Sequence, residues 1–388
     1  MKRILLALAT LVAGACSVAT HPVVIDGHND LLIHYVAPDG KSFQPIDTYA
    51  IAGETPGQVD LPRLKAGGVG AAIFTTAILD SSDREQAIRD STGVLRELAA
   101  QHPDELGIAT DAASLQTIMR RGRIAILMGL EGGDQLGESL TTLEAAHRHG
   151  VRAMTLVWNN SNAIGDSSSA APKHGGLTPF GRDVIATMNR LGMLVDLSHA
   201  SDATVRAALD VTRAPVIFSH SSARALCPAP RNLPDDLLRA VAANGGIDMV
   251  TFVPYFTTTE HWQWYERGEA EWARLQQLHG EDRAEVARGM EAWDAANPPP
   301  EVTVSDVADH IEHIRRTAGI DHVALGSDFD GMGSFRINGL EDASKFPALF
   351  DELKRRGWSR SELEKLASAN FLRVLQAVER AAAAKDDA

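Results

Sequence analysis

Short apolar runs recur along the chain, and amphipathic segments separate them. Runs begin at positions 23, 124, 193, 215 and 322, and three more cover 69–78, 153–158 and 246–252, which makes eight. The segments between them carry apolar residues at spacings of three and four, which predicts helices that pack by one face; they include 84–102, 139–149, 178–191, 201–209 and 235–243. Continuous apolar strands that alternate with helices indicate a parallel sheet, and eight such units predict a closed (β/α)8 barrel, the TIM-barrel form of the α/β class. A doubly wound sheet is the weaker alternative, because no glycine-rich dinucleotide loop follows the first run.

Many of these runs end at a side chain that can bind a metal or carry a proton. The first run leads into His28 and Asp30, whose side chains project to the same side of a strand because strand side chains alternate. Four other runs end at Glu131, His199, His220 and Asp328. A single histidine or acid at a strand end is more simply a hydrogen-bonded core residue. The repetition at successive strand ends instead favours a shared metal site, because the carboxyl ends of barrel strands form one active face.

The types of ligand indicate zinc. Imidazole and carboxylate groups with an open coordination position are typical of catalytic zinc rather than of magnesium or calcium. Glu131 lies between the two groups of ligands in the chain and is the natural bridge, because a carboxylate has two oxygens to share between two cations. Two zinc ions roughly 3.5–4 Å apart could hold a bridging water, lower its pKa to about 7 and so provide a metal-bridging hydroxide at neutral pH.

Six short motifs occur in an order that resembles the renal, or membrane, dipeptidase family of zinc metallopeptidases, within the amidohydrolase-type barrel superfamily. They read DGHND at 26–30, GLEGG at 129–133, DLSH at 196–199, FSHSS at 218–222, RN at 231–232 and GSDFDG at 326–331. The resemblance extends from about position 23 to about position 375. It implies that His28 and Asp30 hold one zinc, that His199 and His220 hold the other, and that Glu131 bridges them.

The resemblance also implies the roles of two further residues. Asp328 would transfer the proton, and Arg231, in a proline-bounded loop, would bind the substrate carboxylate with its planar fork. Asp330 stands two residues beyond Asp328; we assign it a supporting or loop-capping role, and the reversed assignment of the pair is the alternative. The implied activity is the hydrolysis of dipeptides, including those with a D-residue at the C-terminus.

Two departures from the family pattern affect the expected substrate contacts. Where many relatives place a histidine after the fourth strand, this chain has Trp158, so polarisation of the scissile carbonyl would fall to zinc, to Asn159 or Asn162, or to His174 in the following loop. Near the seventh strand, Val253 stands where relatives can place a tyrosine, and the nearby tyrosine is displaced by two residues. Both departures concern side-chain specificity more than the chemistry.

The ends of the chain and its composition limit the remaining possibilities. Residues 1–19 have a basic start and a short apolar core, typical of an export signal. Cleavage after Ala19 and a lipoprotein anchor at Cys16 are competing interpretations, and both predict an exported protein, periplasmic or anchored to the envelope. No further stretch is apolar for long enough to span a membrane. The net charge of −14 argues against a nucleic-acid surface.

We expect one metallopeptidase domain over residues 20–380. The stretch at about 256–300 does not fit a bare barrel; it contains four tryptophans and many charged residues, and predicts a helical insertion between the seventh and eighth strands. It would pack over the barrel rim or against a second subunit in a homodimer. The alternative functions are another metal-dependent hydrolase on the same barrel, acting on a lactone or amide, and a non-catalytic binding protein.

Overall fold

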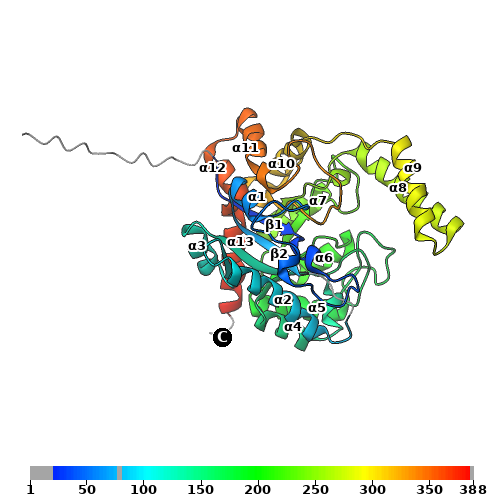
Figure 1. Cartoon of the computed structure of the whole chain (residues 1–388). Helices are drawn as coiled ribbons and strands as arrows, with labels where there is room; N and C mark the ends of the chain where they lie inside the picture. The colour runs from blue at the N-terminus through cyan, green and yellow to red at the C-terminus, as the bar shows by residue number, and fades with distance from the viewer. Residues whose placement is uncertain (1–20, 77–80, 385–388) are drawn as a thin grey trace, which may run out of the picture.

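The computed structural model describes residues 21–76 and 81–384. Eight parallel strands form a nearly closed barrel in the order β1-β2-β4-β5-β6-β7-β8-β9 (Figure 1). Their bounds are β1 Val24–Asn29, β2 Val69–Thr76, β4 Ile124–Glu131, β5 Val151–Thr155, β6 Leu194–Asp196, β7 Ile217–Ser221, β8 Ile247–Val250 and β9 Val323–Leu325. The first and last strands meet where a parallel bridge joins Asn29 and Phe329. The predicted (β/α)8 barrel is therefore confirmed.

A further strand, β3 (Leu106–Ala109), was not predicted. It pairs in parallel with the first half of β4, from Ile124 to Leu127, and lies off the main path of the barrel. Four residues are too few for a period-two pattern to stand out against the helix and turn that flank them. The prediction of eight strands was therefore right for the barrel and incomplete for the sheet.

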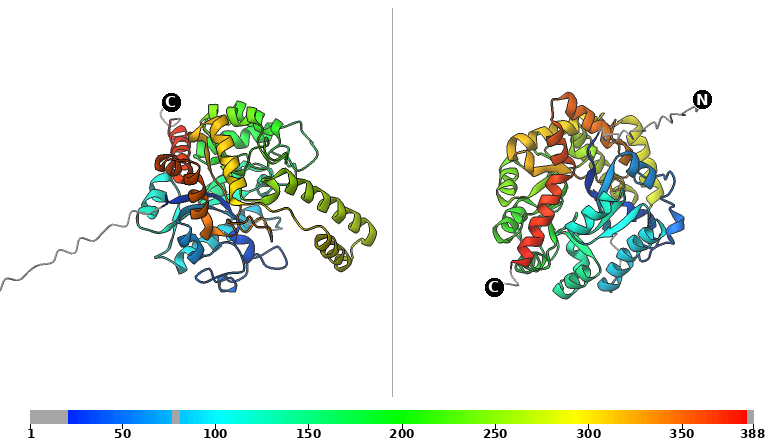
Figure 2. Two further views of the ribbon diagram at one scale, coloured as in Figure 1. Left: turned by 90° about the horizontal axis from the view of Figure 1, so that it is seen from above. Right: turned by 90° about the vertical axis from the view of Figure 1, so that its left-hand side faces the viewer.

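Helices surround the barrel on its outer side (Figure 2). They are α1 Leu61–Ala66, α2 Arg84–Gln101, α3 Ala112–Arg120, α4 Leu140–Arg148, α5 Pro179–Leu191, α6 Asp202–Val211, α7 Asp235–Asn244, α10 Val304–Ala318, α11 Phe346–Arg355, α12 Arg360–Glu364 and α13 Asn370–Ala383. The five helices predicted by sequence periodicity are α2, α4, α5, α6 and α7, each within about two residues of its expected bounds. Side chains of Asp83, Ser139, Thr178 and Ser201 cap the first four by accepting a backbone N–H of the first turn, which explains where these helices begin.

Two more helices, α8 (Thr259–His279) and α9 (Arg283–Ala296), lie between β8 and β9 in the chain. They pack against each other and project away from the barrel in Figure 1 and in the left-hand view of Figure 2. Trp264 is buried, whereas Trp272 on the same helix is 44% exposed. The two tryptophans therefore lie in different environments. The packing of a second subunit against this helix pair stays a prediction.

The alternation of strand side chains determines which residues reach the mouth of the barrel. On β4, Leu127 belongs to the cluster that fills the barrel, whereas Ile126 and Met128 belong to the cluster under the helices. Glu131 is four residues beyond Leu127, so it lies on the inner face at the carboxyl end of the strand. The same alternation places Thr75 two residues beyond Ile73 at the end of β2.

The predicted leader, including Cys16 and Ala19, lies outside the described residues. Export and lipid attachment therefore remain predictions. Within the described part of the chain, the helices are all too short or too polar to cross a lipid bilayer.

Asp248 on β8 is a buried acid whose two carboxylate oxygens have no hydrogen-bond partner among the described residues. Its register partners Phe218 and Val323 belong to the cluster under the helices, so the carboxyl group faces that apolar layer. Burial raises the pKa of Asp248 to about 8, although the charge of Arg231 opposes the shift. The folded protein therefore favours the protonated acid.

We predict that Asp248→Asn changes how stability depends on pH. Because the folded-state pKa of Asp248 is raised above its ordinary value of 3.8, the wild type should lose stability as pH rises through about 8. The asparagine variant lacks this titration. As pH rises from acidic values to about 8.5, the difference in free energy of unfolding between variant and wild type should therefore shift in favour of the variant by a few kcal/mol, at roughly 1.4 kcal/mol per pKa unit. Urea unfolding at several pH values measures this difference. Parallel profiles would contradict it, and Asp47→Asn on the surface is the control.

Candidate active site

A cavity of about 560 Å³ opens at the carboxyl ends of the barrel strands. Eight of the ten predicted site residues line it: Asp30, Glu131, Trp158, Asn159, His199, His220, Arg231 and Asp328. His28 is buried beside them at the end of β1. His174 is exposed and is not among the residues that line this cavity.

His28, Asp30 and Glu131 form one group of potential metal ligands, with one ligand atom from each within 4.8 Å of the others. The Nε2 atom of His28 lies 3.5 Å from Oδ2 of Asp30 and 3.7 Å from Oε1 of Glu131. The hydroxyl of Thr75 is almost equidistant from the two ring nitrogens of His28, 3.3 Å from Nδ1 and 3.4 Å from Nε2. Nε2 is the nitrogen that faces the two carboxylates.

Glu131, His199 and His220 form a second group with the same spread of ligand atoms. The Nε2 atom of His199 lies 3.0 Å from Oε1 of Glu131 and 3.1 Å from Nε2 of His220. Nε2 of His220 lies 3.4 Å from the same carboxylate oxygen. Glu131 thus belongs to both groups, and these two groups share no other residue.

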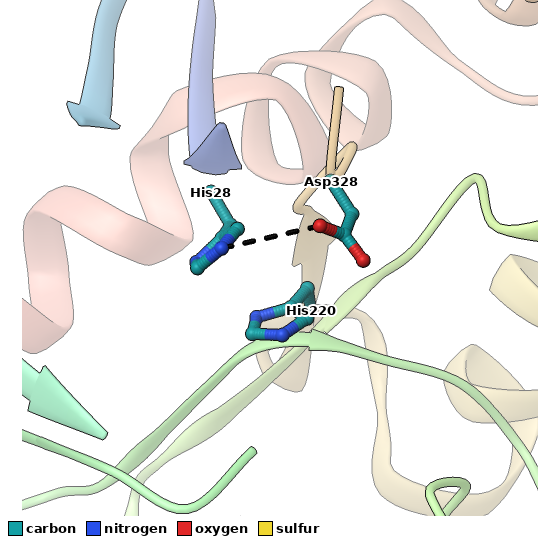
Figure 3. A group of neighbouring side chains, drawn as sticks. All are labelled: His28, His220 and Asp328. Carbon is teal, nitrogen blue, oxygen red and sulfur yellow. Dashed lines mark ion pairs between the residues drawn. The ribbon is translucent and has the colours of Figure 1, made fainter. Parts of the chain in front are cut away.

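Asp328 joins the site from the segment after β9. Figure 3 shows the side chains of His28, His220 and Asp328 pointing toward one another from three different strand ends, and these residues form a third potential ligand group. The dashed line marks the 3.9 Å approach of Asp328 Oδ1 to Nε2 of His28. The rings of His28 and His220 have centroids 3.9 Å apart.

The electrostatics of this cluster favour a bound cation. Burial lowers the pKa of His28, but the charges of Asp30, Glu131 and Asp328 outweigh it and raise the pKa to about 10. Burial raises the pKa of Asp328 well above its ordinary value, and the charges of Asp30 and Glu131 add to that shift. Without a metal, the acids can therefore share this cavity only if protons or cationic side chains offset their charge.

The two other histidines are in the state that a metal requires. Burial lowers the pKa of both His199 and His220 well below the ordinary value, and the charge of Arg231 lowers both further. Neutral imidazoles carry a free lone pair, and the Nε2 atoms of these two rings converge on the oxygen of Glu131. Two imidazoles, a shared carboxylate and a second imidazole–carboxylate pair fit a metal site with nitrogen and oxygen ligands.

The backbone is strained where these side chains are presented. His199, Asp328 and Asp330 all have left-handed φ values, of 68°, 63° and 69°, and only Glu138 shares this feature among the other described non-glycine residues. Such a conformation costs on the order of 1–3 kcal/mol for each residue and occurs most often at functional sites. A Cβ atom at Gly331 would collide with oxygens of Asp30 and Asp328, so this turn also requires glycine.

Two buried aspartates hold the strand ends in place below the ligands. Asp196 accepts hydrogen bonds from the hydroxyls of Thr155 (2.9 Å) and Ser219 (2.5 Å), which ties β5, β6 and β7 together. The hydroxyl of Ser219 also lies 2.8 Å from Nδ1 of His220, so the chain from Asp196 orients that imidazole. Asp26 accepts the backbone N–H and the hydroxyl of Ser327 at 2.7 and 2.6 Å, joining β1 to the segment after β9.

Arg231 is 7% exposed and reaches the cavity from the loop after β7. One of its nitrogens, Nη2, donates to the carbonyl of His220 at 3.3 Å, whereas Nη1 is buried and has no partner among the described residues. The guanidinium carbon lies 5.4 Å from the centre of the Phe256 ring. The side chain is thus fixed in direction but retains hydrogen-bonding capacity on the cavity side.

The structure separates Trp158, which stands at the position of the family histidine, from His174, one of the side chains proposed to take over that histidine's role. Trp158 is 38% exposed, and its ring centroid lies 6.4 Å from that of His199 at the cavity rim. His174 is held by its backbone instead, because its N–H and those of Lys173 and Gly176 donate to the carboxylate of Asp166. His174 therefore stands outside the cavity as the structure describes it.

Asp330 has a different environment from Asp328. Its Oδ1 atom accepts the backbone N–H of Gln58 at 2.5 Å, and its own N–H donates to the side chain of Gln58 at 3.0 Å. Asp330 is not among the residues that line the cavity, whereas Asp328 is. The placement thus matches a loop-supporting position for Asp330 and a cavity position for Asp328.

Some cavity residues were not identified from the sequence. Tyr255 lines the cavity, although from the sequence it was only a tyrosine displaced by two residues from its position in relatives. Val253, which stands at that position, is fully buried and is not among the residues that line the cavity. Thr75 could have been found from the alternation on β2, because it follows Ile73 on the inner face. Phe256 and Asp134 come from short 3-10 helices, Pro254–Phe256 and Gly133–Leu136, which are too short to give a periodic signal in the sequence.

Comparisons with known proteins agree with this geometry. Residues 12–388 match the family model described as membrane dipeptidase (peptidase family M19). Dipeptidase tcpJ of Claviceps purpurea is 37% identical over 393 residues, which is 96% of this chain and 83% of that relative. Dipeptidase 3 of Rattus norvegicus is 35% identical over 364 residues, covering 92% of this chain and 65% of that relative.

Solved structures show the same fold. The probable dipeptidase PvdM from Pseudomonas aeruginosa superposes with a TM-score of 0.79 at 23% identity, covering 93% of this chain and 96% of that one. A metallopeptidase from Rhodobacter sphaeroides, solved with a phosphinate mimic of the dipeptide L-Ala-D-Ala, gives a TM-score of 0.75 at 23% identity, with 92% and 99% covered. With a family match over almost the whole chain and a cavity lined by metal-ligand groups, this protein belongs to the membrane dipeptidase family, peptidase family M19, and is a dipeptidase of the metallopeptidase class.

Proposed function

We propose that this dipeptidase binds two zinc ions and cleaves dipeptides, including those with a D-residue at the C-terminus. The observation that carries the proposal is that Glu131 is shared between two groups of ligands, His28 with Asp30 and His199 with His220. A carboxylate can divide its oxygens between two cations, and mixed imidazole and carboxylate ligands suit zinc. When bound, zinc supplies Lewis acidity, which lowers the pKa of water and polarises a carbonyl group.

Asp328 is the residue that we assign to proton transfer. It lies in the cavity among the ligands, and burial raises its pKa, as does the charge of Asp30, which makes the carboxylate a stronger base. In hydrolysis it would hold the proton lost by the attacking water and deliver it to the leaving amine. Its left-handed backbone and the missing side chain of Gly331 hold the carboxylate in the cavity.

Arg231 is the residue that we assign to the substrate carboxylate. Its buried Nη1 has no partner, and a guanidinium with a free N–H can bind a carboxylate strongly. The carboxylate of a dipeptide is one residue beyond the scissile bond, so a fixed guanidinium beside the metal ligands would select dipeptides over longer chains. Because this contact reads the carboxylate and not the side chain next to it, a D-residue there fits equally well. The Rhodobacter sphaeroides relative with its L-Ala-D-Ala mimic supports this extension.

We predict that Glu131→Ala binds at least one zinc ion fewer than the wild type and loses activity. Removing Glu131 takes a ligand from both groups at once. Elemental analysis of purified protein after dialysis measures the metal content, with close to two zinc ions per chain expected for the wild type. Glu144→Ala, on the surface of α4, is the matched control. A Glu131→Ala variant with full metal and full turnover would exclude the two-metal site.

We predict that Asp328→Asn keeps its metal but lowers kcat by about 10²–10⁴-fold, the usual contribution of a positioned acid–base group. Asparagine has nearly the shape of aspartate but cannot carry the proton. Steady-state kinetics with metal analysis, beside Asp330→Asn, make the comparison. If Asp330→Asn is the severely impaired variant and Asp328→Asn is mild, the roles of the two residues are reversed.

The dipeptide assignment predicts a strong dependence on the substrate carboxylate. Amidation of the C-terminus should lower kcat/KM by roughly 10-fold to 150-fold, equivalent to about 1.5–3 kcal/mol for a hydrogen bond to a charged group. In Arg231→Ala the free dipeptide and its amide should be cleaved about equally slowly. Kinetics on a dipeptide, its amide and the matching tripeptide measure this, with Arg239→Ala, an exposed arginine of α7, as control. Equal wild-type activity on all three substrates is the result that would refute the proposal.

A further inference from the structure

A second cavity, of about 760 Å³, lies between the helix pair α8–α9 and the loop at 334–338. We propose that this second cavity binds a small organic cation with a flat apolar body, an aromatic ring that carries an alkylammonium group. Its volume is within the range of small-molecule pockets, about 300–1,000 Å³. None of the assigned dipeptidase residues lines it.

Aromatic rings form the inner wall of the second cavity. Trp264 of α8 lies 5.4 Å from Trp293 of α9 and 5.9 Å from Phe335, measured between ring centroids. Trp264 is only 6% exposed, and its ring nitrogen donates to the carbonyl of Asn297 at 2.7 Å, which fixes the indole. Aromatic faces attract cations and pack against flat apolar groups.

The packing of the two helices preserves this wall. Gly268 of α8 faces Trp293, and a Cβ atom there would lie 3.3 Å from the indole ring. The absence of a side chain at Gly268 thus lets the ring of Trp293 approach the backbone of α8 closely. The wall is a consequence of specific packing between the helices rather than of loosely arranged surface residues.

His261 supplies a hydrogen-bond acceptor that has no partner. Its side chain lines the second cavity and is 3% exposed. Nδ1 donates to the carbonyl of Pro300 at 3.0 Å, so Nε2 carries the lone pair, and Nε2 has no partner among the described residues. Burial lowers the pKa of His261, which keeps the ring neutral. A buried acceptor of this kind calls for an N–H donor from a ligand.

The rim of the second cavity is acidic. Glu269, Asp294 and Glu301 line its mouth and are exposed. The one cationic side chain on the rim, Arg336, already donates to the carbonyls of Gly333 and Phe335 at 2.6 and 2.7 Å. The rim therefore attracts a cation, the aromatic wall packs against a flat apolar group, and Nε2 of His261 accepts a hydrogen bond from an N–H of the ligand.

The second cavity adjoins the active-site cavity without sharing its ligands. Tyr255 lines the active-site cavity and stacks on Tyr265, which lines the second one, with ring centroids 4.3 Å apart. A cation in the second cavity would therefore sit behind the wall that Tyr255 forms. Binding there must still be distinguished from binding among the acids of the active site.

The test uses tryptamine as the probe, with indole-3-propionate as its anionic counterpart of similar size. Isothermal titration calorimetry on the metal-loaded wild type should show saturable binding of tryptamine and no binding of the anion. Trp293→Leu should weaken tryptamine at least 10-fold because it removes part of the aromatic wall. Glu269→Gln, a surface change that leaves the helix intact, should weaken it several-fold because it removes a rim charge.

Matched control variants on the same helix test whether any loss of binding is specific to the second cavity. Trp272→Leu and Glu271→Gln change residues of α8 that do not line the second cavity, so both should bind tryptamine as the wild type does. Absence of saturable binding overturns the proposal. So does binding that is unchanged in both Trp293→Leu and Glu269→Gln while tryptamine competes with the dipeptide, because the cation then occupies the active site. Since calorimetry needs no turnover, the outcome is independent of whether the assigned dipeptidase mechanism is right.

Discussion

The structure depends on bringing three acids together at the mouth of one barrel. Asp30, Glu131 and Asp328 each have a carboxylate oxygen within 4 Å of Nε2 of His28, in a partly buried cavity where like charges repel strongly. This crowding raises the pKa of His28, and it adds to the effect of burial in raising the pKa of Asp328. A cation relieves this repulsion, so metal binding is expected to stabilise the fold as well as to enable catalysis.

The barrel provides the rigidity that such crowding requires. Each ligand stands at the end of a strand whose neighbours are hydrogen-bonded on both sides, and Asp26 and Asp196 tie these ends to one another. The left-handed backbone at His199 and Asp328 is tolerated because the surrounding strands leave no freedom to relax. The strand framework thus holds these side chains in precise positions.

The helix pair α8–α9 lies outside this strand framework. The stretch carries no metal ligand, yet it builds an aromatic wall around His261 and contacts the active-site wall through Tyr265 and Tyr255. The dipeptidase site and the proposed cation site are therefore built from different parts of the molecule. The first depends on strand ends, and the second depends on packing between segments outside the barrel.

The sequence by itself determined the barrel, five of its helices and a set of candidate metal ligands that the structure brings together, because periodicity and strand-end chemistry are local properties of the chain. It could not separate Trp158 from His174 as cavity residues, since only the hydrogen bonds of Asp166 hold the second one outside. The short strand β3 was missed, and so was the contribution of Phe256 to the cavity. Which oxygens and nitrogens meet within 3–4 Å was decided only by the closure of the barrel, because that closure brings together residues as distant in the chain as His28 and Asp328.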